Sequence, residues 1–341
     1  MRTDFFDYDL PQNAIAQTPI EPRHAARMLV DLGVAGGIEH RTVADLDHLL
    51  EPRDVLVVNN TKVLAARLNL FKPTGGAVEV LLLEPTGNGD EWQALVRPSR
   101  RVADGTKLEL HGRPVVTVGA PVGDGRRLVT IDSAAIDEHG EVPLPPYITE
   151  PLADPDRYQT VFADRIGSVA APTAGLHLSE EVLQRLADRG VAVETIELFV
   201  GLATFRPIST DRIDDHEMHH ERYRVDPAVW ERLIEARDRG GRLVAVGTTV
   251  VRTLESAAIT GELEGSTDLF IRRGHEWRMV DVLLTNFHVP RSSLLVLVDA
   301  FIGERWRELY VTALAEGYRF LSFGDCMLLV RRTEPRRTEI A

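Results

Sequence analysis

Cysteine is almost absent from this sequence, and long apolar runs are missing altogether. The single cysteine, Cys326, excludes an internal disulfide, and the apolar residues around it indicate a buried structural thiol. Apolar stretches such as 294–298 are far shorter than the roughly 20 residues that a membrane-spanning helix needs. The first residues are acidic where a signal peptide would be basic and then apolar. We therefore expect a cytoplasmic protein with no membrane segment.

Positive charge, and lysine in particular, is also scarce. The 341 residues include 39 Lys and Arg against 52 Asp and Glu, and this net charge of −13 argues against a uniformly basic nucleic-acid-binding protein. Only three of the 39 basic residues are lysine, which leaves 36 arginines. Arginine suits planar, bidentate contacts with phosphates and bases, and codon bias in a GC-rich genome is the alternative explanation. The length of the chain is typical of two domains.

Short β-rich runs with glycine-containing turns occupy the region from about residue 69 to 150. The runs are 77–83, 92–96, 107–110, 114–118 and 127–131. Many short strands at regular spacing predict a small barrel or curled sheet. The proline cluster at 143–146 marks the end of this region.

The remainder of the chain alternates strands and helices. The apolar patterns predict strands over 191–200, 242–247, 280–287 and 323–330, and helices over 180–189, 227–239, 250–258, about 294–302 and 305–316. Ser179 is expected to cap the first of these helices and Gly190 to end it. Such alternation is typical of an α/β sheet. A further strand over 54–59 fits either region.

Polar residues follow several of the predicted strands, where open α/β sheets bind ligands. Gly247-Thr248-Thr249 leads from a buried strand into a helix, so its hydroxyls and backbone N–H groups fit an anion or a ribose oxygen. A simple N-cap explains these residues equally well. Arg252 and Glu255 share a face of the same helix, either within the site or as a surface pair.

Three loops carry histidines. His177 ends the loop 171–177, and His288 follows the predicted strand that ends near residue 287. An isolated histidine is usually a packed or surface residue, but two histidines after strand ends favour a chemical role. The third loop, 215–221, lacks the helical histidine spacing of a zinc site, so a ribose- or base-contacting loop and a solvated loop are the better interpretations.

Two common nucleotide-binding fingerprints are missing. No Gly-x-Gly-x-x-Gly opens a strand–helix unit, and no Gly-x-x-x-x-Gly-Lys-Ser/Thr loop occurs. A standard dinucleotide or methyltransferase site is therefore not expected. Local patterns lead to an α/β enzyme with a nucleotide-like site between strand ends.

Several long sequence motifs occur in one order along the chain. They include DVLVVNNTKV over 54–63, PLPPYI over 143–148, VAAPTAGLH over 169–177, GTT over 247–249 with VRTLES over 251–256, and LTNFH over 284–288. Together these motifs resemble those of the S-adenosylmethionine:tRNA ribosyltransferase-isomerase family of queuosine biosynthesis. The resemblance runs almost end to end and is very specific.

The resemblance implies both a fold and a reaction. The fold is an α/β main domain over 1–68 and 151–341, with a β-barrel-like domain inserted at 69–150. The reaction moves the ribosyl part of S-adenosylmethionine to the aminomethyl group of the 7-aminomethyl-7-deazaguanine wobble base of tRNAs with a queuosine-type anticodon. Isomerisation gives epoxyqueuosine, and adenine and methionine are released. S-adenosylmethionine is then a cosubstrate, and we expect no cofactor, no metal and a monomer.

Such a reaction needs a base for the proton beside the sulfonium, an acid for the departing adenine and a neutral amine. The resemblance implies catalytic candidates within the matching motifs: His177, His219, His288, Glu221 and Asp281. Implied contacts to the cosubstrate are Thr173, Gly175, Thr248, Thr249, Arg252, Glu255 and Asn286. Implied contacts to tRNA or its acceptor base are Arg23, Arg27, Asn59, Asn60, Arg67, Arg97 and Arg206. The base and the acid stay unassigned among the candidates, and a surface role is the alternative for each arginine.

The sequence departs from the usual motifs of the family at a few positions. Phe199 stands where a histidine is usual, Leu202-Ala203 stands where Ala-Gly is usual, and Leu178 stands where phenylalanine is usual. Arg272-Arg273 stands where a Tyr-Pro pair is common. Two alternatives follow: a paralogue that ribosylates an acceptor other than tRNA, and a tRNA- or nucleotide-binding homologue without catalysis. The intact TAGLH and TNFH motifs favour a catalytic protein over one that only binds.

Charge and the expected partner are compatible in this interpretation. Recognition of one anticodon nucleotide needs only a local positive rim. The acidic total therefore excludes only a uniformly basic protein.

Overall fold

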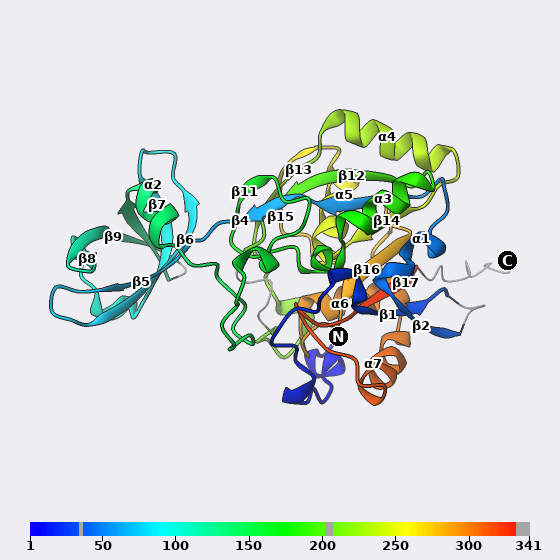
Figure 1. Ribbon diagram of the computed structural model, residues 1–341, viewed down its shortest axis with the longest axis horizontal. Coiled ribbons are helices and arrows are strands. Elements are labelled where there is room, and N and C mark those ends of the chain that lie inside the picture. The colour runs from blue at the N-terminus through cyan, green and yellow to red at the C-terminus, as the bar shows by residue number, and fades with distance from the viewer. Residues whose placement is uncertain (34–36, 124, 202–206, 332–341) are drawn as a thin grey trace. The chain divides into compact units, whose positions relative to one another are not determined.

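Two units make up the chain in this computed structural model, which describes residues 1–33, 37–123, 125–201 and 207–331. The first unit comprises Met1–Thr61, Pro146–Arg165 and Pro172–Ala341, and the second comprises Lys62–Pro145 and Ile166–Ala171. Figure 1 labels the elements of both units. Two of the four points at which the chain passes from one unit to the other lie within short paired strands, β4 (Thr61–Val63) and β11 (Arg165–Ser168).

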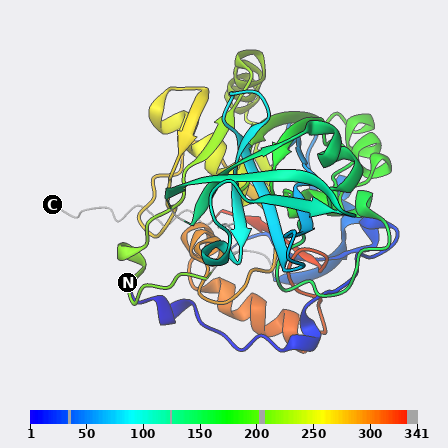
Figure 2. The same cartoon turned by 90° about the vertical axis from the view of Figure 1, so that its left-hand side faces the viewer.

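The second unit contains a closed antiparallel barrel with the strand order β10-β7-β6-β5-β8-β9. Its strands, cyan to green in Figure 2, are β5 (Arg67–Phe71), β6 (Ala77–Pro85), β7 (Glu91–Arg97), β8 (Lys107–Leu110), β9 (Arg113–Gly123) and β10 (Arg126–Ile131). All five predicted runs lie within β6 to β10, so the barrel prediction is confirmed. Strand β5 begins at Arg67 and pairs along its length with β6. Helix α2 (Ser133–His139) follows the last strand.

Among the described residues of the first unit, nine strands form one sheet, in the order β15-β13-β12-β3-β14-β16-β17-β1-β2. The central strands β12 (Ala192–Leu198), β3 (Val55–Asn59), β14 (Leu243–Val246) and β16 (Val282–Asn286) run parallel. The next strand, β17 (Cys326–Val330), is antiparallel to β16 and parallel to β1 (Arg27–Asp31). Antiparallel strands complete both edges: β13 (Glu221–Arg224), β15 (Glu264–Thr267) and β2 (Ile38–Thr42).

The predicted strands over 54–59, 191–200, 242–247, 280–287 and 323–330 are confirmed, and the first belongs to this sheet. The edge strands β2, β13 and β15 were not predicted. Their sequences, IEHRT, ERYR and EGST, are short and polar, so they carry no apolar signal. The sheet is therefore α/β in its centre and mixed at its edges.

The predicted helices are confirmed as α3 (Glu180–Asp188), α4 (Pro227–Asp238), α5 (Thr248–Thr260), α6 (Ser293–Ile302) and α7 (Arg305–Ala315). Ser179 caps α3 through the N–H of Val182, as predicted, and Gly190 follows its end with a φ of +81°. A one-turn helix, α1, spans Leu46–Leu49. Short 3₁₀ turns occur at Thr3–Phe6, Gln12–Ala14, Arg23–Ala25, Val43–Asp45, Ser99–Arg101, Pro155–Tyr158, Thr173–His177 (η7) and Ile213–Asp215. No helix among the described residues is both long and apolar enough to cross a bilayer.

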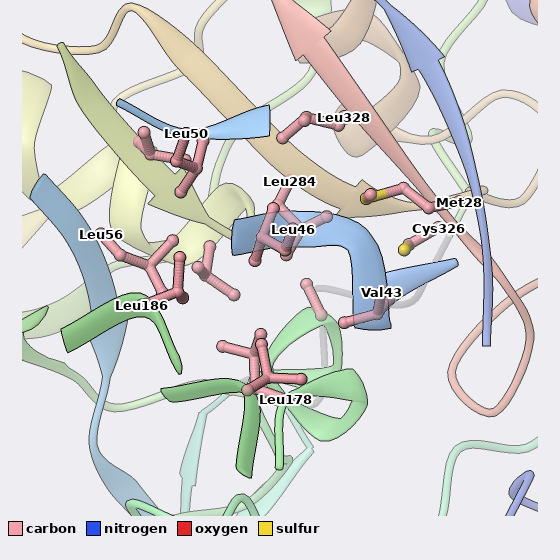
Figure 3. Packing of buried hydrophobic residues seen from close by; sticks show 14 of the residues in the cluster. Met28, Val43, Leu46, Leu50, Leu56, Leu178, Leu186, Leu284, Cys326 and Leu328 are labelled. Carbon is pink, nitrogen blue, oxygen red and sulfur yellow. The ribbon is translucent and has the colours of Figure 1, made fainter. Parts of the chain in front are cut away.

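One face of the sheet contributes to a hydrophobic core of the first unit (Figure 3). Alternate residues of neighbouring strands point into it, including Leu56, Leu284 and Leu328. Leu178 and the apolar stripe of α3 cover this face together with α1. Cys326 lies fully buried in this core, which confirms the structural thiol.

The parallel strands also determine where a site can form. Because β3, β14 and β16 point the same way, the residues that follow them, Asn60, Gly247 and Phe287, share one edge of the sheet. We refer to this as the carboxyl edge. The turn η7 contacts β16.

Candidate functional site

Three residues from different motifs meet at the end of β16. Asn286 is the last residue of this strand, and its Nδ2 donates hydrogen bonds to Nε2 of His177 at 2.9 Å and to the carbonyl oxygen of Leu321 at 3.1 Å. The hydroxyl of Thr173 donates to Asn286 Oδ1 at 3.4 Å. Thr173 and His177 are the first and last residues of η7, so this turn lies over the end of the strand. His177 and Asn286 are both buried.

The hydrogen bonds of Asn286 also define the state of His177. A carbonyl oxygen only accepts, so the bond to Leu321 identifies the amide nitrogen of Asn286 and makes Nε2 of His177 an acceptor. An imidazole that accepts at Nε2 is neutral and carries its proton on Nδ1. Burial lowers the pKa of His177 to about 4, and three positive charges add to this effect, those of Arg319, Arg157 and Arg23. His177 is therefore neutral at pH 7.

The junction between β14 and α5 adjoins the same turn. Gly247 has a φ of +89°, and a Cβ at this position would lie 3.4 Å from Ala174 Cβ in η7. Glycine allows both the left-handed backbone and this close approach. Thr248 and Thr249 begin α5 and are buried, and Thr249 Oγ1 has no hydrogen-bond partner in the described part of the chain. A helix N-terminus beside an unpaired hydroxyl fits an anionic group or a ribose oxygen.

His288 follows Asn286 by two residues and is held by its backbone. Its N–H donates to the hydroxyl of Tyr310 at 2.9 Å, and its carbonyl oxygen accepts from the hydroxyl of Tyr8 at 2.6 Å. Nε2 of the ring lies 3.0 Å from Thr285 Oγ1. Burial lowers the pKa of His288 to about 3, so this ring is also neutral at pH 7.

Gly175 supports the turn by packing. A Cβ at this position would lie 2.8 Å from Phe162 Cζ and 3.0 Å from Thr160 Cγ2, both shorter than ordinary contacts. Any side chain larger than hydrogen would therefore displace the ring of Phe162. The structure gives Gly175 a steric reason that is independent of a ligand.

Arg23 fastens η7 to the segment that precedes it. Its guanidinium donates to the carbonyl oxygens of Gln159 at 2.8 Å, Leu176 at 3.4 Å and Asp156 at 3.1 Å. Burial lowers the pKa of Arg23. Arg23 also lines a small pocket beside His177, together with Arg157 and Ser322.

Arg252 and Glu221 form a buried ion pair that links α5 to β13. Arg252 also donates to the carbonyl oxygens of Thr267 at 3.1 Å and Leu269 at 3.3 Å. The other carboxylate oxygen of Glu221 accepts from the N–H of Gly201 at 3.0 Å. Both side chains are thus bonded within the protein, and the pair joins two elements.

Two of the predicted carboxylates lie away from the carboxyl edge. Glu255 is fully buried and accepts from His275 Nε2 at 3.1 Å and from three backbone N–H groups at 2.9–3.0 Å, those of Arg278, Met279 and Val280. Burial opposes ionisation of Glu255, but these hydrogen bonds keep its pKa below the ordinary value. Asp281 precedes β16, at the opposite end from Asn286, and accepts from the N–H of Leu243 at 3.1 Å.

The remaining predicted residues are spread over the molecule. Asn59 is buried and bonds both the N–H and the carbonyl of Leu198 across β3 and β12, at 3.2 and 2.9 Å. His219 is exposed in the loop before β13. Arg27 stacks on the ring of Tyr318 at 3.8 Å. In the second unit, ion pairs join Arg67 and Arg97 to the same partner, Glu79, at 3.6 and 3.8 Å. Arg206 lies outside the described residues.

The residues that differ from the usual family motifs lie in different surroundings. Leu178 is fully buried in the core of the first unit. Arg222 lies over the ring of Phe199 at 5.0 Å. Leu202 and Ala203 fall outside the described residues. Arg273 is bonded to the buried carboxylate of Asp299 at 2.6 and 2.7 Å.

Sequence reasoning missed the residues that reach the site from far along the chain. Tyr8 acts on His288 from 280 residues away, and the carbonyl of Leu321 orients Asn286 from 35 residues away. A backbone carbonyl leaves no trace in a sequence, and an isolated tyrosine carries no motif. Arg157 and Arg319, whose positive charges help to lower the pKa of His177, were not singled out from the sequence either. Within the described ranges, no group of three or more His, Cys, Asp or Glu side chains is placed to hold a metal ion.

These observations define the class: an α/β enzyme with a β-barrel unit and a polar site at the carboxyl edge of parallel strands. A family model described as queuosine biosynthesis protein matches residues 3–329, and the chain belongs to this family. The chain is 49% identical to the S-adenosylmethionine:tRNA ribosyltransferase-isomerase of Anaeromyxobacter dehalogenans, with 97% of this chain and 100% of the relative covered. It is 48% identical to the enzyme of the same name from Moorella thermoacetica, with the same coverage.

A solved structure supports the same assignment of family and fold. The crystal structure of S-adenosylmethionine tRNA ribosyltransferase from Thermotoga maritima matches with a TM-score of 0.56 and 37% identity. The match covers 95% of this chain and 99% of that chain. The α/β fold with a barrel, predicted from strand spacing and from the motifs shared with the family, is confirmed.

Proposed function

We propose that this chain transfers and isomerises the ribosyl part of S-adenosylmethionine onto the 7-aminomethyl-7-deazaguanine wobble base of tRNA. Epoxyqueuosine-tRNA is the product, and adenine and methionine are released. Full-length relatives at 48–49% identity carry the name S-adenosylmethionine:tRNA ribosyltransferase-isomerase, which favours this reaction over a paralogue with another acceptor or a homologue without catalysis. The observation that carries the proposal within the molecule is the contact between Asn286 and a neutral His177 beside the start of α5.

The carboxyl edge provides suitable partners for the adenosine part of the cosubstrate. Thr249 Oγ1 is buried without a partner among the described residues, so a ligand hydroxyl at this point gains a hydrogen bond that the protein alone leaves unmade. Thr248 and the free N–H groups of the first turn of α5 add further donors. Thr173 and Asn286 close the other side of this edge.

We assign the base to His177. Removal of a proton beside a sulfonium needs an unprotonated group, and a histidine with a pKa of about 4 is unprotonated throughout the neutral range. Asn286 acts as a positioning residue, because its hydrogen bond to Nε2 determines the orientation of the ring. The only lone pair of the neutral ring is at Nε2, so the amide of Asn286 must release this atom when His177 takes the proton. His288 is neutral too and serves as a hydrogen-bonding group rather than a proton donor.

The acid that protonates adenine is then assigned to His219, the candidate histidine that is not buried. Glu221, Arg252, Glu255 and Asp281 already bond to other groups of the protein, so we give them supporting roles. Among the expected tRNA contacts, Asn60 Oδ1 has no partner among the described residues, and Arg97 lies 3.8 Å from Glu79, beyond hydrogen-bond distance. Arg23, Arg27 and Asn59 instead form hydrogen bonds within the protein.

The proposal is tested by incubating the protein with S-adenosylmethionine and tRNA that carries the aminomethyl-deazaguanine base. Mass spectrometry of the digested nucleosides should show the added epoxycyclopentanediol, with one adenine released for each event. His177→Gln should lower kcat by about 10²- to 10⁴-fold with little change in KM. His48→Gln, at an exposed histidine of α1, is the matched control and should keep full activity.

Each failure has a separate meaning. No mass gain on the tRNA would overturn the proposed reaction. Adenine release without tRNA modification would identify a paralogue with another acceptor. The absence of adenine under every condition would leave a binding protein.

A further inference from the structure

A second polar cavity lies at the carboxyl edge of β3 and β12, in the first unit. Its volume is about 450 Å³, within the range of small-molecule sites. Asn60, which follows β3, and Glu197, near the end of β12, form part of its lining. The guanidinium groups of Arg165 and Arg224 line it as well. No residue of the site around His177 belongs to it.

Three charged groups of this cavity, those of Glu197, Arg165 and Arg224, are only loosely paired, whereas the lining residue Arg232 is bonded to Glu194 at 2.5 and 2.7 Å. Glu197 lies 3.6 Å from Arg165 Nε and 3.8 Å from Arg224 Nη1, so the charges attract without a hydrogen bond. Asn60 Oδ1 is buried and has no partner among the described residues. A carboxylate, an amide oxygen and two guanidinium groups are thus left with unused hydrogen-bonding capacity.

The exposure of these groups shows how a ligand would enter. The side chain of Glu197 is only 17% exposed, whereas those of Arg165 and Arg224 are 58% and 47% exposed. The acceptors therefore lie at the base of the cavity and the cations at its rim. A rim of this kind admits a group that is presented by a larger molecule.

We propose that this cavity receives a guanine-type base, with Glu197 accepting its two adjacent N–H donors and an arginine at the rim donating to its carbonyl oxygen. A carboxylate is the natural acceptor for two parallel donors, and this bidentate arrangement is strong and directional. Single-stranded RNA bases are commonly read in this way on their Watson–Crick edge, with guanidinium planes available for stacking. This inference rests on the proposed function, since it assigns the acceptor base of the tRNA to this cavity.

The position of the cavity is compatible with such a role. Strand β3 separates β12 from β14 in the sheet, so Glu197, near the end of β12, and Gly247, which follows β14, belong to strands about 10 Å apart. A base held at Glu197 would therefore lie two strands away from the junction where we place the cosubstrate. The zwitterionic end of an amino acid is the competing occupant, and the experiment separates the two.

The test compares RNA hairpins that differ by one amino group. Anticodon stem–loops carrying guanosine or inosine at the wobble position are titrated by fluorescence anisotropy, because inosine lacks only the 2-amino donor. The wild-type protein should bind the guanosine hairpin about tenfold more tightly. Glu197→Gln should reduce this ratio to near one by weakening the guanosine complex. Glu264→Gln is the matched control: it removes a carboxylate 3.7 Å from Arg224 that is 78% exposed and outside the cavity, so the ratio should stay near ten.

A second variant guards against a folding defect in the first. Arg165→Ala, at an exposed rim position, should weaken both hairpins by a similar factor, because both bases carry the same carbonyl oxygen. Glu197→Gln with an unchanged ratio, or wild-type protein that does not distinguish the hairpins, would overturn the inference. A raised KM for S-adenosylmethionine in Glu197→Gln, with the ratio intact, would assign the cavity to an amino-acid end and also overturn it.

The failure of the inference is distinguishable from the failure of the proposed function. Adenine release by the wild-type protein with modified tRNA is measured in parallel. If adenine is released and the hairpin ratio of Glu197→Gln is unchanged, only the base assignment fails. If no adenine is released, the proposed reaction fails whatever the hairpins show.

Discussion

The neutral state of His177 has a measurable consequence for stability. A histidine with a pKa of about 4 in the folded chain and about 6.5 in the unfolded chain binds more protons after unfolding at every pH between these values. Stability is therefore retained above pH 6.5 and is lost as the pH falls toward 4. At pH 5 the loss from this one residue amounts to about 2 kcal/mol relative to pH 7.

The assay compares the wild-type protein with His177→Gln by urea unfolding at pH 7 and pH 5. Glutamine is the appropriate replacement because its Oε1 takes the place of Nε2 and can accept from Asn286 without titrating. All other groups titrate in both proteins, so their effects cancel in the difference. The unfolding free energy of the wild type should fall by about 2 kcal/mol more than that of the variant between the two pH values. His48→Gln, at an exposed position, should follow the wild type.

One result would refute this reasoning. If His177→Gln and the wild type lose the same free energy between pH 7 and pH 5, His177 titrates alike in both states, and its neutral form is not imposed by the fold. An NMR titration of the ring provides an independent check, since its midpoint should lie near pH 4 rather than near 6.5. The assignment of His177 as the base depends on this outcome.

Three further predictions concern neighbouring residues. Thr249→Val should raise the KM for S-adenosylmethionine about five- to tenfold without loss of stability, because Oγ1 has no partner within the described chain; an unchanged KM would contradict its role. Gly175→Ala should lower the unfolding free energy by about 1–3 kcal/mol, and Phe162→Leu in the same chain should restore most of it, because the clash is with that ring; no restoration would contradict the steric explanation. Glu255→Gln should cost about 2–4 kcal/mol in urea unfolding, because an amide cannot accept from all four donors, while kcat per folded molecule stays near wild type; a selective loss of kcat would return Glu255 to the site.

The arginine excess illustrates the limit of composition. Arg272 pairs with Asp214, Arg273 with the buried Asp299, and Arg278 with the carbonyl of Ala258 at 2.8 Å. These residues therefore neutralise or bond groups of the chain itself, and a count of arginines cannot separate this use from RNA contact. Arg165 and Arg224 differ from these three arginines in their loose pairing at a cavity, which only coordinates can show.

The sequence by itself determined the local elements and the family. Helices α3 to α7 and the central strands follow from apolar periodicity, caps and glycine stops, which act between residues a few positions apart. The shared motifs identified the family for a related reason: each is a short contiguous segment, so it can be recognised without knowledge of the fold. The turn η7 and the junction at Gly247 were thus singled out before their relative positions were known.

Only the tertiary structure decided which polar residues share a site and which are bonded elsewhere. Asn286 and His177 are 109 residues apart, and their contact depends on the placement of η7 over β16. The same long-range packing buries Glu255 under four donors and places Asp281 at the far end of its strand. A hydrogen bond needs its partner within about 3 Å, and chain folding, rather than spacing along the sequence, brings such partners together.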